Sequence, residues 1–397
     1  MRTLEDVAGA VGTPFYAYDA DLFRERIARF RAAFDEPPEI CYALKANDAL
    51  ALVAIAAAEG LGADIVSGGE LAKALRAGIP AQRIVFSGVG KTRAEISAAL
   101  EAGVRTLNVE SLGELDVIAE EATALGVVAP VSVRLNPDVE AGTHTYIATG
   151  SAASKFGLGL EDARAGYERA AGHPALEPVG ISFHVGSQLL DTGPVLAAGE
   201  RAAGLWRELG AAGIRLRDLD AGGGLGIAYD GGEDADVDAY AATLSALVRD
   251  LGAGLVLEPG RWLVGPVGTF VTRVLYVKDA PGRRIAVCDG GMNDLIRPSL
   301  YGASHPISVL GTERERGTLD VVGPVCESGD FFALGVDLPL PEPGDLLAIG
   351  QAGAYCRVMS SAYNARPLCA EVLREAGAYR VIREPVSADT LASAERL

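Results

Sequence analysis

A pattern that occurs eight times between residues 39 and 260 constrains the fold of this chain more than any other feature of its sequence. Short apolar segments alternate there with turns of Gly, Asn or Ser and with Ala-rich segments of helical periodicity. Strands are predicted at 39–45, 62–67, 83–88, 106–111, 129–136, 179–186, 216–222 and 254–260. Eight strands with crossover helices favour a closed (β/α)8 barrel, although a doubly wound open sheet has the same local pattern with fewer strands.

The pattern changes after Arg261, where long helical segments give way to shorter apolar segments broken by Gly and Pro. These predict strands at 262–277, 284–289, 318–325, 345–350 and 366–382. An isolated apolar segment at 13–18 is expected to join them. We therefore predict an α/β protein with a TIM-type barrel at 22–262, followed by a smaller all-β domain formed by 1–21 and 263–397.

Composition limits the classes of partner. The formal net charge is −18 and no Lys/Arg-rich run occurs, which argues against a nucleic-acid or anionic-membrane surface. Glu5 and Asp6 stand where a signal peptide is apolar, and no apolar run reaches the roughly 18 residues of a membrane span. The cysteines are scattered, with no metal-binding spacing, so we expect reduced thiols, no metal and a cytoplasmic protein. They are Cys41, Cys288, Cys326, Cys356 and Cys369.

Lys45 ends the first predicted strand of the barrel, in the segment EICYALKAN at 39–47. Active sites of barrel enzymes are built at the carboxyl ends of the strands. A half-desolvated lysine there loses basicity and can hold a carbonyl as a Schiff base. The alternative is a lysine whose stem covers apolar surface while its ammonium reaches water. This segment alone leaves both interpretations open.

A glycine-rich turn, AGGGLG at 221–226, follows the seventh predicted strand of the barrel. Its backbone N–H groups can close around an anion. A dinucleotide fingerprint would instead open the first βα unit. Barrels place phosphate sites after strands seven and eight, where this turn and Glu258–Arg261 fall.

His184 and Glu258 end two further predicted strands. An imidazole at the barrel mouth can stack on a planar cofactor, although a satisfied core histidine is as common. A carboxylate at Glu258 can pair with a ring nitrogen and keep it protonated, or form a salt bridge with Arg261. Lysine, flat ring, carboxylate and phosphate turn together indicate pyridoxal 5'-phosphate.

Several motifs make the chain resemble the fold-type III pyridoxal-phosphate decarboxylases, and most closely the diaminopimelate decarboxylase family. The resemblance covers almost the whole length, from TPFYAYD to the last predicted strands. Its motifs are YALKAN (42–47), SGGEL (67–71), NPDVEAGTHTYIATG (136–150), SKFG (154–157), FHVGSQ (183–188), GGGLG (222–226), EPGR (258–261), RPSLYGA (297–303), CESGD (326–330), GAYC (353–356) and SSAYN (360–364).

The resemblance implies roles for individual residues. Lys45 would bind the cofactor covalently, His184 would stack on its ring and Glu258 would pair with its nitrogen. The phosphate would be surrounded by Ser187, Gly223, Gly224, Gly260 and Tyr355. The substrate would be bound by Arg261, Arg297, Tyr301, Glu327 and Tyr355. Cys326 and Glu327 would enter the site from the second subunit of a homodimer.

Cys326 is the expected proton donor to the substrate Cα, with Lys45, His184 and Glu258 as the other catalytic residues. A thiol is a competent general acid, but a cysteine is more often a buried small hydrophobe. The neighbouring Glu327 and Asp330 make a wholly apolar role less favourable. Local sequence leaves both roles open.

The expected reaction is decarboxylation of meso-2,6-diaminopimelate to L-lysine and CO2. The distal end of that substrate carries an ammonium and a carboxylate, which Glu327 and Arg297 with Tyr301 would bind. The alternative is a decarboxylase of another basic amino acid, of the ornithine, lysine or arginine type. A non-catalytic pyridoxal-phosphate carrier should lack the β domain or Lys45 and Cys326, and an alanine racemase should lack CESGD.

Overall fold

The computed structural model describes residues 1–139 and 154–396. These residues pack into two compact units. The barrel unit comprises 26–227 and 234–262, and the sheet unit comprises 1–25, 228–233 and 263–397. Residues 228–233 thus pack with the sheet unit although the chain on both sides belongs to the barrel unit. The domain limits at 22–262 stay a prediction.

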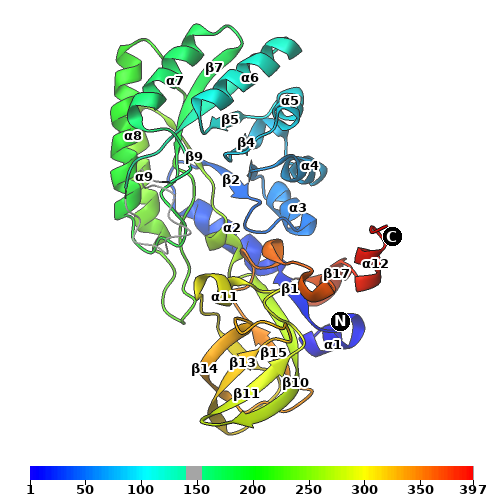
Figure 1. The fold of residues 1–397 in the computed structure, drawn as a ribbon. Helices are drawn as coiled ribbons and strands as arrows, with labels where there is room; N and C mark the ends of the chain where they lie inside the picture. The colour runs from blue at the N-terminus through cyan, green and yellow to red at the C-terminus, as the bar shows by residue number, and fades with distance from the viewer. Residues whose placement is uncertain (140–153, 397) are drawn as a thin grey trace. The chain divides into compact units, whose positions relative to one another are not determined.

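The barrel is closed and entirely parallel (Figure 1). Each strand pairs with the next, and the last returns to the first through Glu39 opposite Val256. The predicted TIM-type barrel is therefore confirmed. Its strands are β2 (Glu39–Ala43), β3 (Gly62–Ile65), β4 (Ile84–Phe86), β5 (Thr106–Val109), β6 (Ala129–Leu135), β7 (Leu176–Phe183), β8 (Asp218–Asp220) and β9 (Gly254–Leu257).

Helices surround the barrel strands, and several begin directly after a strand ends (Figure 1). Ser67, Thr92, Ser111 and Asp236 are N-caps whose side chains accept backbone N–H groups of the first turn. Such caps fix the start of each helix, and hence the length of each loop at the barrel mouth. The helices are α2 (Ala20–Ala32), α3 (Leu50–Ala58), α4 (Gly68–Arg76), α5 (Arg93–Ala102), α6 (Leu112–Leu125), α7 (Leu160–Gly172), α8 (Gly193–Ala211) and α9 (Val237–Leu251).

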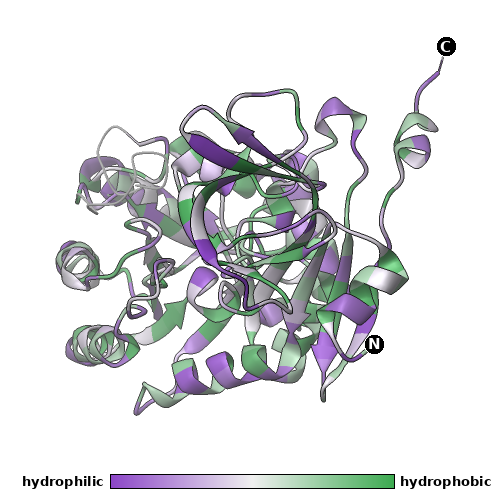
Figure 2. Ribbon diagram, turned by 90° about the horizontal axis from the view of Figure 1, so that it is seen from below, coloured by the Kyte–Doolittle hydropathy of each residue, from purple (hydrophilic) through white to green (hydrophobic). Residues whose placement is uncertain are grey.

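The helices are amphipathic rather than uniformly apolar, and Figure 2 shows hydrophobic and hydrophilic residues on the same helices. In α8, for example, Val195, Ala202 and Leu209 are buried while Arg201 is exposed. Within the described residues, no helix is both long and apolar enough to cross a membrane.

The sheet unit contains a sheet of mixed direction with strand order β14-β13-β11-β10-β1-β16-β17; β15 also pairs with β10, and β12 pairs with β15. Strand β1 (Phe15–Asp19) lies between β10 and β16: Phe15 faces Val271 in antiparallel pairing and Ala370 in parallel pairing. The other strands are β10 (Gly268–Ala280), β11 (Arg283–Cys288), β12 (Ile307–Val309), β13 (Arg316–Val322), β14 (Phe331–Pro339), β15 (Leu346–Ile349), β16 (Ala370–Glu375) and β17 (Ala378–Arg383).

Short helices interrupt the sheet unit, where the sequence had predicted only strands. They are α1 (Leu4–Val11), α11 (Arg297–Tyr301) and α12 (Ala388–Ala392), while α10 (Arg261–Val264) begins in the barrel unit and ends in the sheet unit. Helix α1 begins with a capping box between Thr3 and Asp6. Its residues Val7 and Ala8 pack against Phe15.

Candidate active site

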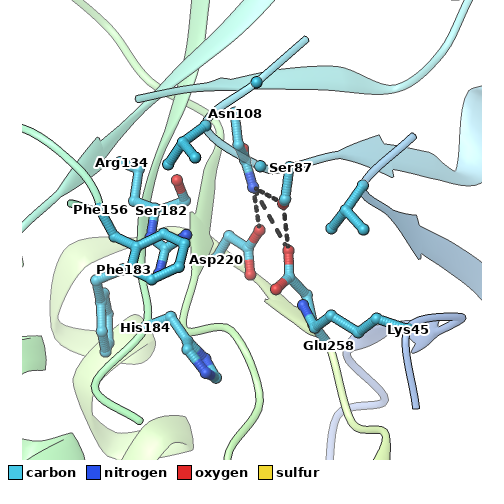
Figure 3. A pocket seen from close by; sticks show the side chains of 14 residues that line it. Lys45, Ser87, Asn108, Arg134, Phe156, Ser182, Phe183, His184, Asp220 and Glu258 are labelled. Atoms are coloured by element: carbon cyan, nitrogen blue, oxygen red, sulfur yellow. Dashed lines mark hydrogen bonds between the residues drawn. The ribbon is translucent and has the colours of Figure 1, made fainter. Parts of the chain in front are cut away.

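A cavity of about 390 Å³ opens at the carboxyl ends of the barrel strands (Figure 3). Three residues predicted for cofactor binding line it together, namely Lys45, His184 and Glu258. The remaining lining residues are Val66, Ser87, Gly88, Val89, Gly90, Asn108, Arg134, Phe156, Ser182, Phe183 and Asp220.

Lys45 follows β2 by two residues, and its ammonium pairs with a carboxylate from inside β3. Lys45 Nζ lies 2.6 Å from Asp64 Oδ2, and the Asp64 side chain is completely buried. The Lys45 side chain is 32% exposed, so its amine is accessible while its charge is held in place. Asp64 Oδ1 has no hydrogen-bond partner among the described residues. The ion pair therefore leaves an acceptor for a further donor.

A second acidic group in the cavity consists of two carboxyls, Asp220 from β8 and Glu258 just after β9. Each of the two carboxyls shifts the pKa of the other. Asn108 Nδ2 lies 3.2 Å from Asp220 Oδ2 and 3.4 Å from Glu258 Oε1, and Ser87 Oγ donates to Glu258 Oε1 at 3.3 Å. Burial and the neighbouring Asp220 carboxylate raise the pKa of Glu258 well above its usual range. Both effects favour the protonated form of Glu258 inside the cavity.

His184 is a neutral imidazole. Burial lowers its pKa well below the usual value, and the positive charges of Arg134 and Lys45 add to the effect. The backbone N–H of Gly223 donates to His184 Nδ1 at 3.2 Å, which leaves Nε2 as the protonated nitrogen. The ring can therefore present a flat neutral face rather than a charge.

Backbone atoms of neighbouring loops pack closely against the glycine turn after β8. A Cβ on Gly223 would lie 2.2 Å from the Glu258 carbonyl oxygen, and one on Gly224 would lie 2.4 Å from that of Gly186. Gly224 also has a φ of +110°, which disfavours any side chain. Only glycine fits at these two positions, as a turn that binds an anion through its backbone requires.

Ser187 and Arg261 meet beside this turn, where Arg261 Nη2 donates to Ser187 Oγ at 2.9 Å. Arg261 is buried and begins α10, and Gly260 packs against Ala46 of the YALKAN motif.

Five of the predicted site residues belong to the sheet unit. Arg297 begins α11 and is only 5% exposed, while Tyr301 ends the helix and is half-buried. Tyr355 is half-buried with a φ of +56°, a backbone conformation that is uncommon outside glycine. Cys326 and Glu327 are both exposed.

The buried carboxylate of Asp330 fixes the loop that carries Cys326 through hydrogen bonds to the backbone. The Asp330 carboxylate accepts N–H groups of Met292 and Val325, both at 2.6 Å. Cys326 N–H donates to Asn364 Oδ1 at 3.2 Å, which joins the CESGD and SSAYN motifs. Asp330 is therefore a buried organiser of the loop, and the thiol stands at the surface of the chain.

Asp64, Asp220 and Asn108 are lining or pairing residues that the sequence interpretation did not identify. Asp64 and Asn108 lie inside β3 and β5, and Asp220 lies two residues before the end of its predicted strand at 216–222, whereas the predicted site residues stand at the ends of predicted strands. The available signal was a carboxylate within an otherwise apolar strand, because such a charge is rarely buried without a functional or paired role. Most of the predicted motif at 136–150 lies outside the described residues.

The cavity fits the cofactor that its residues suggest. An accessible lysine, a neutral imidazole, a protonated buried carboxyl and a side-chain-free glycine turn lie at the strand ends of one barrel. Fold and site together define the class of barrel enzymes that bind pyridoxal phosphate.

Residues 20–265 match the family model for the pyridoxal binding domain of pyridoxal-dependent decarboxylases. Diaminopimelate decarboxylase of Zymomonas mobilis is 43% identical over 98% of this chain and 94% of its own length. That of Neisseria meningitidis serogroup B is 47% identical over 95% and 91%. The chain belongs to the diaminopimelate decarboxylase family of pyridoxal-dependent decarboxylases.

Solved structures agree. Diaminopimelate decarboxylase from Helicobacter pylori complexed with L-lysine has a TM-score of 0.96 at 43% identity, with 99% of both chains covered. A lysine/ornithine decarboxylase from Vibrio vulnificus complexed with putrescine has a TM-score of 0.83 at 24% identity, which shows the fold alone. The predicted class of enzyme and its cofactor, pyridoxal 5'-phosphate, are confirmed.

Proposed function

We propose that the chain decarboxylates meso-2,6-diaminopimelate to L-lysine and CO2, as a cytoplasmic homodimer. Membership of the family supports the reaction. The observation that supports diaminopimelate as the substrate is Arg297, a buried guanidinium with no carboxylate partner among the described residues. A buried charge without a counter-ion is costly, so an anion supplied by the substrate would stabilise it.

The distal carboxylate of diaminopimelate is such an anion. An ornithine or lysine decarboxylase acts on substrates whose distal end carries only an amine, for which a buried guanidinium is repulsive. We assign Arg297 and Tyr301 to the distal carboxylate, and Glu327 to the distal ammonium. Arg261 and Tyr355 complete the substrate-binding set.

The residues of the barrel unit would hold the cofactor. Lys45 would bind it covalently, His184 would cover its ring, and Glu258 would face its nitrogen. Its phosphate would be held by Ser187, Gly223, Gly224, Gly260 and, from the sheet unit, Tyr355. When bound, pyridoxal phosphate supplies an electron-withdrawing ring that accepts the electron pair left when CO2 departs.

The chain's own residues then govern protons. Glu258 and Asp220 keep a proton within the cavity, which matches the need for a protonated ring nitrogen. Cys326 Sγ would donate a proton to the substrate Cα after CO2 has left. Its exposure in the single chain is consistent with a thiol that enters the site of a second subunit.

One experiment tests the cofactor and the substrate together. Purified protein should release CO2 and form L-lysine from meso-diaminopimelate, and borohydride should fix a pyridoxyl group to Lys45 Nζ. The Lys45→Ala variant should lose both the reducible adduct and activity. A wild-type preference for D-lysine or ornithine would refute the substrate while leaving the decarboxylase class intact.

The proposed location and assembly have separate support. No disulfide joins any of the five cysteines, all of which lie in the described part of the chain, and reduced thiols are typical of the cytoplasm. Fractionation of cells that produce the protein tests the location, and light scattering tests the homodimer.

A further inference from the structure

Arg297 is held by two residues to which the family motifs give no role. Its Nη1 lies 2.9 Å from Nε2 of His305, which is itself buried. Its Cζ lies 4.6 Å from the ring centroid of Tyr229. Tyr229 belongs to residues 228–233, the short segment that packs with the sheet unit. The three residues thus form a cluster within one unit.

The hydrogen bonds of His305 determine its charge. Its Nδ1 lies 2.9 Å from the carbonyl oxygen of Gly350, which only accepts, so Nδ1 carries the proton. Its Nε2 faces Nη1 of Arg297, which only donates, so Nε2 is the acceptor. His305 is therefore neutral, and it orients the guanidinium without neutralising it.

Tyr229 supports the guanidinium in a similar way. An aromatic face attracts a cation without removing its charge. The Tyr229 and His305 rings also meet edge to face, with centroids 5.1 Å apart. Meanwhile Arg297 Nε is buried and has no hydrogen-bond partner among the described residues. The cluster fixes the orientation of Arg297 but leaves its charge and one donor available.

We propose that His305 and Tyr229 are positioning residues that preorganise Arg297 as a carboxylate receptor and so set the preference for a substrate with a distal carboxylate. This inference rests on the proposed function, in which Arg297 binds that group. A carboxylate in place of His305 would hold Arg297 equally well but would satisfy its charge. Neutral positioning is thus the property that matters.

L-Lysine and cadaverine separate this idea from a general structural role. L-Lysine retains the distal carboxylate and ammonium of the substrate, whereas cadaverine has the same chain with no carboxylate. Their dissociation constants can be measured on the cofactor-loaded protein by spectral titration, without turnover. The ratio of the two constants reports the carboxylate receptor alone.

The variants are His305→Gln, His305→Glu and His305→Leu, with Tyr229→Phe and Tyr229→Leu. Gln keeps a neutral acceptor, and we expect a ratio within about threefold of wild type. Glu and Leu should each lower the preference for L-lysine by roughly 10-fold or more, as expected when a hydrogen bond to a charged group is lost or its charge is satisfied. Tyr229→Phe should keep the preference and Tyr229→Leu should reduce it.

Wild type and Arg297→Leu distinguish a failure of the proposed function from a failure of the positioning role. A wild type without preference for L-lysine, or an Arg297→Leu variant that keeps it, would refute the proposed function. If those two behave as expected, an unchanged ratio in His305→Glu and His305→Leu would overturn the positioning role alone. Thermal melts of each variant identify any that fail to fold. If His305→Glu fails to fold, the comparison of His305→Gln with His305→Leu still tests the positioning role.

Discussion

Arg297 and Lys45 are contrasting cations of the candidate site. Lys45 is matched by Asp64 at 2.6 Å, whereas the partners of Arg297 among the described residues are a neutral ring nitrogen and an aromatic face. A matched amine can be released to act on a cofactor, while an unmatched guanidinium attracts an anion. The difference lies in the counter-ion and not in burial alone.

Replacing Arg297 tests this contrast through turnover. We expect Arg297→Leu to lower kcat/KM for meso-diaminopimelate by roughly 30-fold to several thousandfold, because losing a buried charge-assisted contact costs about 2–5 kcal/mol. D-Lysine has no distal carboxylate, and its kcat/KM should change much less. Equal losses with both substrates would mean that Arg297 acts on the fold rather than on substrate choice.

Glu70 and Glu95, in neighbouring helices, should respond to pH with opposite signs. Burial raises the pKa of Glu70 to about 7, whereas backbone hydrogen bonds from Gly68 and Thr92 lower that of Glu95. Glu70 is most favourable below its unfolded pKa of about 4.5, and its contribution is lost as pH rises through about 7. The contribution of Glu95 is present above about 4.5 and is lost on acidification.

The matched variants are Glu70→Gln and Glu95→Gln. Relative to wild type, Glu70→Gln should gain stability between pH 5 and 8, while Glu95→Gln should lose more at pH 8 than at pH 4. Urea midpoints of the cofactor-loaded proteins across this range measure both. If the pH curve of each variant ran parallel to that of wild type, neither carboxyl would have a shifted pKa.

At the scale of elements, Lys91 joins three pieces of the barrel mouth. Its side chain is completely buried, and Nζ donates to Gly88 O at 2.8 Å, Asn108 O at 2.7 Å and Glu114 Oε1 at 2.6 Å. These belong to the loop after β4, to β5 and to α6. The same loop and strand supply Ser87 and Asn108 to the Glu258 network, so Lys91 holds that network in place.

Lys91→Met should therefore destabilise the barrel. Breaking a buried ion pair by removing one partner costs about 3–5 kcal/mol, because the other charge stays buried. The control is Lys73→Met: Lys73 pairs with Asp48, but both side chains are about one third exposed, and such pairs contribute about 0–1 kcal/mol. Urea unfolding compares them, and similar losses would contradict the role given to Lys91.

The sequence predicted the barrel because its strands are apolar runs separated by helical segments, a pattern that survives without any tertiary knowledge. It did not predict that Asp64 pairs with Lys45 or that Asp220 lines the cavity, since the direction in which a residue of a short buried strand points depends on barrel closure. Helix α1 was missed although Thr3 and Asp6 carry a capping box. Strand β12 has three residues and is defined by its pairing with β15, which no local pattern reports.

For the whole molecule, the exposed thiol of Cys326 and the accessible amine of Lys45 lead us to expect sites shared between subunits. Mixing Lys45→Ala with Cys326→Ala should restore activity, because each hybrid dimer has one intact site. Random exchange should give about one quarter of wild-type activity, since half of the dimers are hybrids. Verified exchange without recovery would mean that one chain supplies both residues.

Strand β1 has a consequence for synthesis on the ribosome. It is translated before the whole barrel, yet it lies between β10 and β16, which end at Ala280 and Glu375. At typical translation rates its neighbours follow after a delay on the order of tens of seconds, during which the barrel strands emerge. The nascent chain therefore carries an unpaired apolar strand while the barrel folds, and this strand is open to pairing with other chains. Because of the order of translation, β1 is made before the barrel but can pair with β10 and β16 only after the barrel has been made.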